Sequence, residues 1–139
     1  MTRGSKLLAW RKFYLGIAKL FAERSYDPRL KVGCVIVTQT GVMYCGYNGN
    51  AVDEPNTPDS KELGQTGFIH AEVNSLLRFN PSIDKDSTMY ITVSPCIVCS
   101  RLIINCKGIK EVYYSEEYRD KRGVKLLNKN GIRCKRIEA

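Results

Sequence analysis

The sequence predicts an α/β fold, with a mostly parallel sheet that helices cover on both faces. In the second half of the chain, apolar runs with strand character alternate with helical segments, which is typical of parallel strands joined by helices. The first half instead contains two strand-like runs separated by a Thr-Gly turn. This pair predicts one antiparallel hairpin at the start of the sheet.

The elements are predicted in the order αββαβαβαβ. The first helix has apolar residues at spacings of three and four and ends at SYDP, because proline disfavours helix in the residue before it. The last two helices are each followed by a glycine, a common residue just past a helix end. We expect a helix at 6–25, a hairpin within 31–49, a helix at 70–79, a strand at 87–93, a helix within 96–108, a strand at 110–115, a helix within 121–131 and a strand at 132–137.

The composition is that of one globular domain spanning residues 1–139, with 43% hydrophobic and 26% charged residues. No apolar run approaches the roughly 18 residues that a membrane span needs. The first residues mix charges with apolar side chains, unlike a secretory signal. We therefore expect an intracellular, cytoplasmic protein without a membrane partner (host cytoplasm, if the source is a virus).

Two further features concern partners and thiols. The formal net charge of +8 fits an anionic partner of any size, but the basic residues are scattered and do not interleave with aromatics as in a single-strand binding groove. In a reducing compartment, the six cysteines are not expected to form disulfides. Cys34, Cys45, Cys106 and Cys134 lie in apolar stretches, and we expect each to be an inert buried thiol.

The remaining two cysteines, in SPCIVC, are candidate metal ligands. Cys96 and Cys99 are three positions apart at a predicted helix start, so both sulfurs can reach one ion, and a helix N-terminus favours the thiolate. With His70, the only histidine, they would form a tetrahedral zinc site whose fourth position is open to water. A Cys-x-x-Cys pair also occurs in redox motifs and as buried thiols, and a spare cysteine could close a purely structural zinc site.

Glu72 is the candidate catalytic acid and base. A spacing of two keeps it off the helical face of His70, so we expect the carboxylate to reach over the metal and transfer the proton of the metal-bound water. The simpler alternative is a glutamate that complements the helix dipole. His-x-Glu followed by Pro-Cys-x-x-Cys is, however, the signature of zinc deaminases that act on nucleobases.

At this point the chain resembles the cytidine deaminase superfamily and, within it, the deoxycytidylate (dCMP) deaminases. HAEVNSLL and SPCIVCSRLIINCKGIKEVYY carry the metal motif, and SYDPRLKVGCVIV, GYNG and YSEEYRDKRGVKLLNKNGI extend the resemblance over most of residues 25–133. The resemblance implies a three-layer α/β/α cytidine deaminase-like fold with a five-stranded mixed sheet.

The resemblance also implies an activity, namely zinc-dependent hydrolytic deamination of dCMP to dUMP and ammonia. Glu72 would protonate the ring nitrogen N3 and then the departing amine. Asn48 would contact the sugar, and the backbone at Ala71 would hold the base. Tyr118 and Arg29 are weaker candidates for contacts with the sugar and the phosphate.

Family members are commonly hexameric, activated by dCTP and inhibited by dTTP. This implies a homo-oligomer, nucleotide effectors that contact Asn48 and Gly49, and Mg²⁺ accompanying the triphosphate. In many relatives GYNG continues with Pro and Gly, whereas here it continues with Asn-Ala-Val, which predicts a differently shaped loop.

Other functions compete with this interpretation. A deaminase of a base within transfer RNA or single-stranded DNA would suit the positive charge, but residues 50–62 carry four acidic residues and one lysine. We therefore favour a free nucleotide and expect no nucleic-acid partner. A bifunctional dCTP/dCMP deaminase and a binding module with structural zinc are the remaining alternatives.

Overall fold

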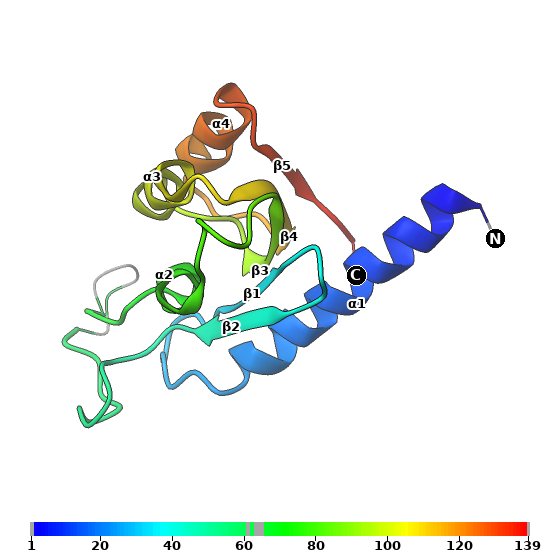
Figure 1. Ribbon diagram of the computed structural model, residues 1–139. Helices are drawn as coiled ribbons and strands as arrows, with labels where there is room; N and C mark the ends of the chain where they lie inside the picture. The colour runs from blue at the N-terminus through cyan, green and yellow to red at the C-terminus, as the bar shows by residue number, and fades with distance from the viewer. Residues whose placement is uncertain (1, 61, 63–65, 139) are drawn as a thin grey trace.

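The computed structural model describes residues 2–60, 62 and 66–138. A five-stranded sheet lies between α1 on one face and the group of α2, α3 and α4 on the other, so the predicted three-layer α/β/α fold and the predicted element order are confirmed (Figure 1). The elements are α1 (Arg3–Ala22), β1 (Gly33–Val37), β2 (Met43–Tyr47), α2 (Ala71–Arg78), β3 (Ser87–Val93), α3 (Ile97–Cys106), β4 (Ile109–Glu116), α4 (Arg122–Lys129) and β5 (Arg133–Arg136).

The strand order is β2-β1-β3-β4-β5, and among the described residues the pairings β3–β4 and β4–β5 are parallel and the other two antiparallel. The sheet is therefore less parallel than predicted, because β1 pairs antiparallel with β3 as well as with β2. Burial explains this order. All five residues of β1 are buried, which suits an interior strand, whereas β2 has exposed residues at both ends and forms the edge.

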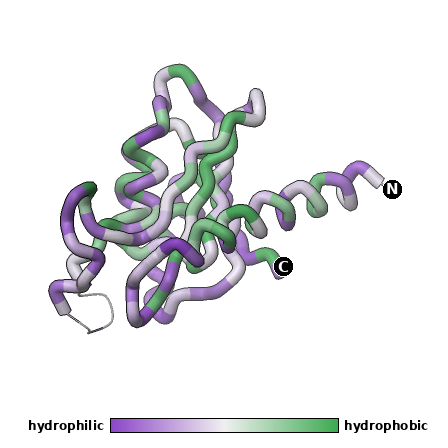
Figure 2. Tube along the Cα trace, turned by 90° about the horizontal axis from the view of Figure 1, so that it is seen from below, coloured by the Kyte–Doolittle hydropathy of each residue, from purple (hydrophilic) through white to green (hydrophobic). Residues whose placement is uncertain are grey.

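Two hydrophobic cores lie on the two faces of the sheet. In β1, Cys34 and Ile36 belong to the core beneath α2, α3 and α4, whereas Val35 and Val37 belong to the core beneath α1. This alternation follows from the two-residue period of a strand. The hydropathy colouring of Figure 2 shows hydrophobic segments in the middle of the molecule and hydrophilic loops projecting from it. Over the residues described, none of the helices combines the length and apolar character that crossing a membrane requires.

Helix α1 ends at Ala22 and not at residue 25 as predicted, and two other helix ends also differ from the prediction. Helix α1 begins earlier than expected because Thr2 caps it, accepting a hydrogen bond from the Ser5 N–H at 3.0 Å. At the end of α3, the left-handed residue is Lys107, with φ of 60°, and not the glycine that follows it. Gly108 is required for close packing instead, because a Cβ there would lie 2.7 Å from the ring of Phe79.

The six cysteines are free thiols. Cys34 and Cys134 are buried, as predicted, but the prediction of burial is wrong for Cys45 and Cys106, which are half-buried. Cys45 lies on the edge strand β2, and Cys106 occupies the last turn of α3, where fewer neighbours cover a side chain.

The segments that form the site lie along the carboxyl edge of the sheet, which is a row of strand ends and not an edge strand such as β2. Strands β2, β3 and β4 run in the same direction, since β1 is antiparallel to both β2 and β3. The carboxyl ends of these three strands therefore lie at one edge, together with the beginning of β1. Ligands of open α/β sheets bind at such an edge.

Candidate metal centre and substrate cavity

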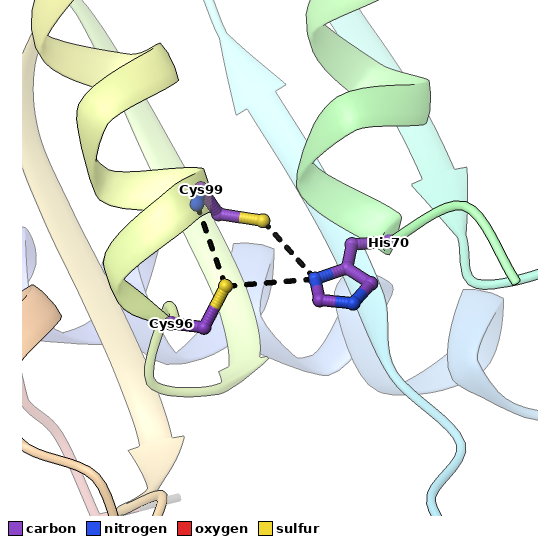
Figure 3. A group of neighbouring side chains, drawn as sticks. All are labelled: His70, Cys96 and Cys99. Atoms are coloured by element: carbon purple, nitrogen blue, oxygen red, sulfur yellow. Dashed lines mark hydrogen bonds between the residues drawn. The ribbon is translucent and has the colours of Figure 1, made fainter. Parts of the chain in front are cut away.

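His70, Cys96 and Cys99 meet at this edge, so the predicted ligand set is brought together (Figure 3). The His70 Nδ1 atom lies 3.2 Å from the Cys99 Sγ atom and 3.7 Å from the Cys96 Sγ atom. In a tetrahedral zinc site the same two kinds of ligand atom lie about 3.5 Å apart, as follows from the usual Zn–N and Zn–S bond lengths. The donor set and its spacing therefore fit zinc, with three protein ligands.

Helix starts position these ligands. His70 immediately precedes α2, and Cys96 is the N-cap of α3, where its sulfur accepts a hydrogen bond from the Cys99 N–H at 3.4 Å. The start of α4 packs against the turn that precedes α3. A Cβ at Gly123 would lie 2.3 Å from the Pro95 carbonyl oxygen and 2.8 Å from that of Cys96. Only glycine permits this approach. It keeps the turn that contains Pro95 and Cys96, called the cysteine turn below, packed against the start of α4.

The two thiols differ in protonation. Hydrogen bonds from Cys99 and His70 lower the pKa of Cys96 to about 4, although burial opposes this shift. The hydrogen bond to Cys96, together with burial, raises the pKa of Cys99. Cys96 is therefore a thiolate at neutral pH, the form that binds a metal ion.

Glu72 is buried, with only 4% of its surface exposed, and lines the same cavity as His70 and Cys96. Burial raises the pKa of its carboxyl group to about 7, and hydrogen bonds and the charge of His70 only partly offset this shift. A carboxyl group with this pKa can both accept and donate a proton near neutral pH.

The cavity has a volume of about 220 Å³. Tyr118 lines it, but Arg29 and Gly49 are not among its lining residues. Arg29 is exposed, and the backbone N–H and C=O of Gly49 pair with Ile69. Six of the predicted site residues line the cavity, namely Asn48, His70, Ala71, Glu72, Cys96 and Tyr118.

Asn48 is buried and connects β2 to the segment before β1. Its Nδ2 group donates hydrogen bonds to Asp27 Oδ2 at 3.0 Å and to the Leu30 carbonyl at 2.8 Å. Its Oδ1 atom accepts from the Val32 N–H at 2.8 Å. Both amide hydrogens are thus used within the chain, and Oδ1 keeps one lone pair for another donor.

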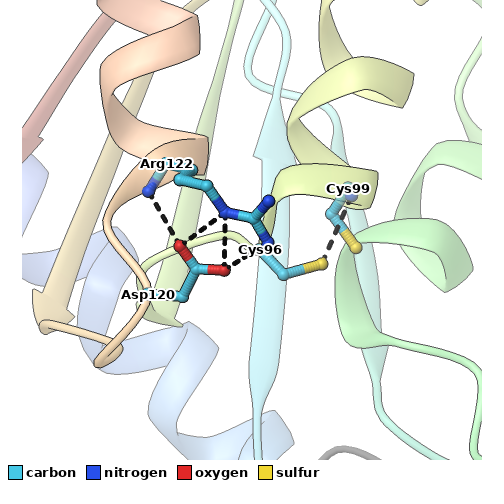
Figure 4. Close-up of polar contacts among 4 residues, drawn as sticks. All are labelled: Cys96, Cys99, Asp120 and Arg122. Carbon is cyan, nitrogen blue, oxygen red and sulfur yellow. Dashed lines mark hydrogen bonds and ion pairs between the residues drawn. The ribbon is translucent and has the colours of Figure 1, made fainter.

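The loop after β4 forms the other side of the site. The Tyr118 N–H donates a hydrogen bond of 2.6 Å to Ser94 Oγ, which ties this loop to the end of β3. Arg122 donates hydrogen bonds to the carboxylate of Asp120 from Nε at 3.1 Å and from Nη2 at 2.8 Å, beside the cysteine turn (Figure 4). Hydrogen bonds from Arg122 lower the pKa of Asp120 to about 2.

Sequence reasoning missed several residues that line the cavity. Asp27 belongs to SYDP, which predicts a helix end and carries part of the family resemblance but was assigned no site residue at Asp27, and Thr66 and Phe68 close the long loop before His70. The signal that could have identified Asp27 is an acidic residue within SYDPRLKVGCVIV, a segment that carries the family resemblance. The apolar wall could not be foreseen, because strand ends that are distant in sequence form it: Leu30, Val32, Ile91 and Val93.

Comparison with known proteins agrees with this site. Residues 8–116 match the family described as the cytidine and deoxycytidylate deaminase zinc-binding region. The deoxycytidylate deaminase of Saccharomyces cerevisiae is 35% identical over 136 residues, which span 89% of this chain but 43% of the yeast protein. That of Homo sapiens is 32% identical over 123 residues, which span 81% of this chain and 68% of the human protein.

A solved structure is also similar. The dCMP deaminase of cyanophage S-TIM5, crystallised with dCMP and dUMP, superposes with a TM-score of 0.80 at 30% identity, covering 99% of each chain. Because the family match covers most of the chain and includes His70, Cys96 and Cys99, this protein belongs to the cytidine and deoxycytidylate deaminase family.

Proposed function

We propose that this protein catalyses the hydrolytic deamination of dCMP to dUMP and ammonia, and that residues 1–139 form the catalytic unit. One observation carries the proposal: a buried carboxyl group, Glu72, with a pKa of about 7 shares a cavity with two of the three side chains of a His/Cys/Cys site. A binding module with structural zinc would have no use for this carboxyl group. The names of the similar proteins support dCMP as the substrate.

When bound by His70, Cys96 and Cys99, zinc would supply an activated water as the nucleophile at C4 of cytosine. Glu72 would accept one proton of this water and donate it to N3, and would then accept the second proton, from the hydroxyl group formed at C4, and donate it to the leaving amine. The C4–N bond breaks, a C4 carbonyl forms and ammonia departs. Ala71, fully buried at the start of α2, lines the cavity where its backbone can hold the base.

A single nucleotide fits the charges around the cavity better than a nucleic acid does. The loop between β4 and α4 carries Arg119 next to the lining residue Tyr118, which suits one phosphate group, whereas Lys121 and Arg122, the first residue of α4, pair with Glu117 and Asp120. Arg29 remains a second candidate for the phosphate. The segment 50–62 on the way to His70 carries four acidic residues, which would repel a continuous strand.

The test measures ammonia release by the zinc-loaded protein from dCMP, dCTP, deoxycytidine and a cytosine-containing oligonucleotide. Turnover of dCMP without turnover of the oligonucleotide is the expected result. Turnover of dCTP at a similar rate would favour the bifunctional alternative, and turnover of the oligonucleotide alone would refute the proposal.

Regulation by dCTP and dTTP, Mg²⁺ binding with the triphosphate, a hexameric assembly and a cytoplasmic location stay predictions. At Asn48 only Oδ1 keeps a free lone pair, and the Gly49 backbone pairs with Ile69, so an effector at this position would have to donate a hydrogen bond to Asn48. Rates of dCMP turnover with and without each triphosphate, and the mass in solution, test these predictions.

A further inference from the structure

We infer that Asp27 selects nucleotides with a free 3′-hydroxyl group, because it places a carboxylate beside Asn48 at the end of the cavity where the 3′ position of the sugar would lie. This inference rests on the proposed function and deepens it. It assigns to one side chain the exclusion of cytosines that lie within a nucleic-acid strand.

Asp27 is buried and accepts hydrogen bonds from neutral donors. Its Oδ1 atom accepts from the backbone N–H of Arg29 at 2.8 Å and of Leu30 at 3.2 Å. Its Oδ2 atom accepts from Asn48 Nδ2 at 3.0 Å and from Thr66 Oγ1 at 3.5 Å. The contact with Thr66 is at the limit of a hydrogen bond, so Oδ2 can accept a better-placed donor from a ligand.

Asp27 and Asn48 therefore present acceptor atoms to a ligand at this end of the cavity. Both amide hydrogens of Asn48 are used within the chain, which leaves one lone pair on its Oδ1 atom beside the carboxylate of Asp27. A hydroxyl group complements this pair because it can donate a hydrogen bond. A phosphate group does not, because it brings a second negative charge and only acceptor oxygens.

The sheet separates Asp27 and Asn48 from the loop after β4, which carries Arg119. Asn48 follows β2 and Tyr118 follows β4, with β1 and β3 between these two strands. Three strand spacings amount to about 14 Å, enough for a nucleoside monophosphate. With its base at His70, such a nucleotide can direct its 5′-phosphate toward the loop after β4 and its 3′-hydroxyl toward Asp27. A 5′-phosphate at Arg29, whose backbone N–H binds Asp27, is the opposite placement and would contradict this inference.

A cytosine inside a strand carries a phosphate on both sides of its sugar. The 3′-phosphate would meet the Asp27 carboxylate in a partly desolvated site, where repulsion between like charges is strong. Deoxycytidine 3′,5′-bisphosphate reproduces this feature in a small molecule, and it differs from dCMP only by the 3′-phosphate.

The experiment compares kcat/KM for dCMP and for the bisphosphate in the wild type, Asp27→Asn and Asp53→Asn. Asparagine is nearly the same size and still accepts the two backbone hydrogen bonds, and Asp53 is an exposed loop residue outside the cavity lining. We expect the wild type to prefer dCMP by about 100-fold or more, Asp27→Asn to reduce that preference at least about tenfold, and Asp53→Asn to leave it unchanged.

The ratio of the two kcat/KM values does not depend on the fraction of folded enzyme, so partial unfolding of Asp27→Asn does not mimic the effect. Asp27→Ser, which also removes the charge, should reduce the preference in the same direction. A wild type without preference for dCMP, or two Asp27 variants that both keep the full wild-type preference, would overturn the inference.

Binding measurements separate this inference from the proposed function. If dCMP is not turned over, the proposed function fails, and the dissociation constants of dCMP and the bisphosphate for the zinc-loaded protein still test Asp27. Weaker binding of the bisphosphate that Asp27→Asn relieves would support the inference, whereas equal dissociation constants in the wild type would refute it.

Discussion

The Nδ1 atom of His70 lies 3.2 Å from the Sγ atom of Cys99, although 29 positions separate the two residues in the chain. Each residue lies at the start of a helix that packs on the same face of the sheet, and β3 connects the two helices. The metal centre is thus assembled where helix starts meet the carboxyl edge of the sheet.

Removing one ligand should abolish metal binding. In Cys99→Ser a neutral hydroxyl replaces the sulfur ligand, so we expect zinc content to fall from about one per chain to a small fraction. Cys106→Ser is the matched control, because the half-buried thiol of Cys106 is not part of the ligand group and donates a hydrogen bond to the Ile103 carbonyl. Atomic absorption on both purified variants makes the measurement, and equal zinc content would contradict the assigned ligand set.

Replacing the buried carboxyl group should stop proton transfer without removing the metal. We expect Glu72→Gln to lower kcat for dCMP by about 10²- to 10⁴-fold or more, since a positioned general acid–base group contributes this much. Zinc content should stay at the wild-type value. Glu138→Gln, at a side chain that is 87% exposed, is the control and should leave kcat unchanged. Full activity of Glu72→Gln would assign the carboxyl group a structural role.

The contact between α4 and the cysteine turn should tolerate only glycine. Gly123→Ala would place a methyl group 2.3 Å from the Pro95 carbonyl oxygen, so we expect the free energy of unfolding to drop by about 1–3 kcal/mol. Gly16→Ala, inside α1 with no atom within 4 Å of the added carbon, should instead raise it by about 0.5–1 kcal/mol. Urea unfolding of both variants measures the difference, and a neutral Gly123→Ala would show that the turn adapts.

Stability at alkaline pH should depend on Tyr113. Burial and the hydrogen bond to Glu111 raise its pKa from 10 to about 12. The folded state therefore holds this proton more tightly than the unfolded state, and the resulting stabilisation is complete below pH 10 and disappears as the pH rises to about 12.

The free energy of unfolding should consequently fall less steeply between pH 10 and 12 in Tyr113→Phe than in the wild type. Denaturant unfolding at several pH values provides this comparison. Because Tyr26 is 60% exposed, Tyr26→Phe serves as a control that also removes one phenol. Parallel curves for wild type and Tyr113→Phe would contradict the proposed cause.

Local patterns in the sequence determined the element order and the chemistry of the metal site. Apolar periodicity predicts each helix and strand. Ligands such as His70 and Cys96 can be predicted from their residue type and from the motifs around them. Glu72 could be assigned from its spacing to His70 for the same reason. These are short-range properties, which a linear sequence records directly.

The tertiary structure alone decided the strand order, the burial of Glu72 and the place of Asp27. The hairpin inserts with β1 toward the centre, because the fully apolar strand is stabilised by neighbours on both sides. That order brings Asp27, before β1, against Asn48, after β2, and against Thr66, before α2. Hydrogen bonds and burial of this kind depend on which distant segments become neighbours, and packing of the whole chain determines that.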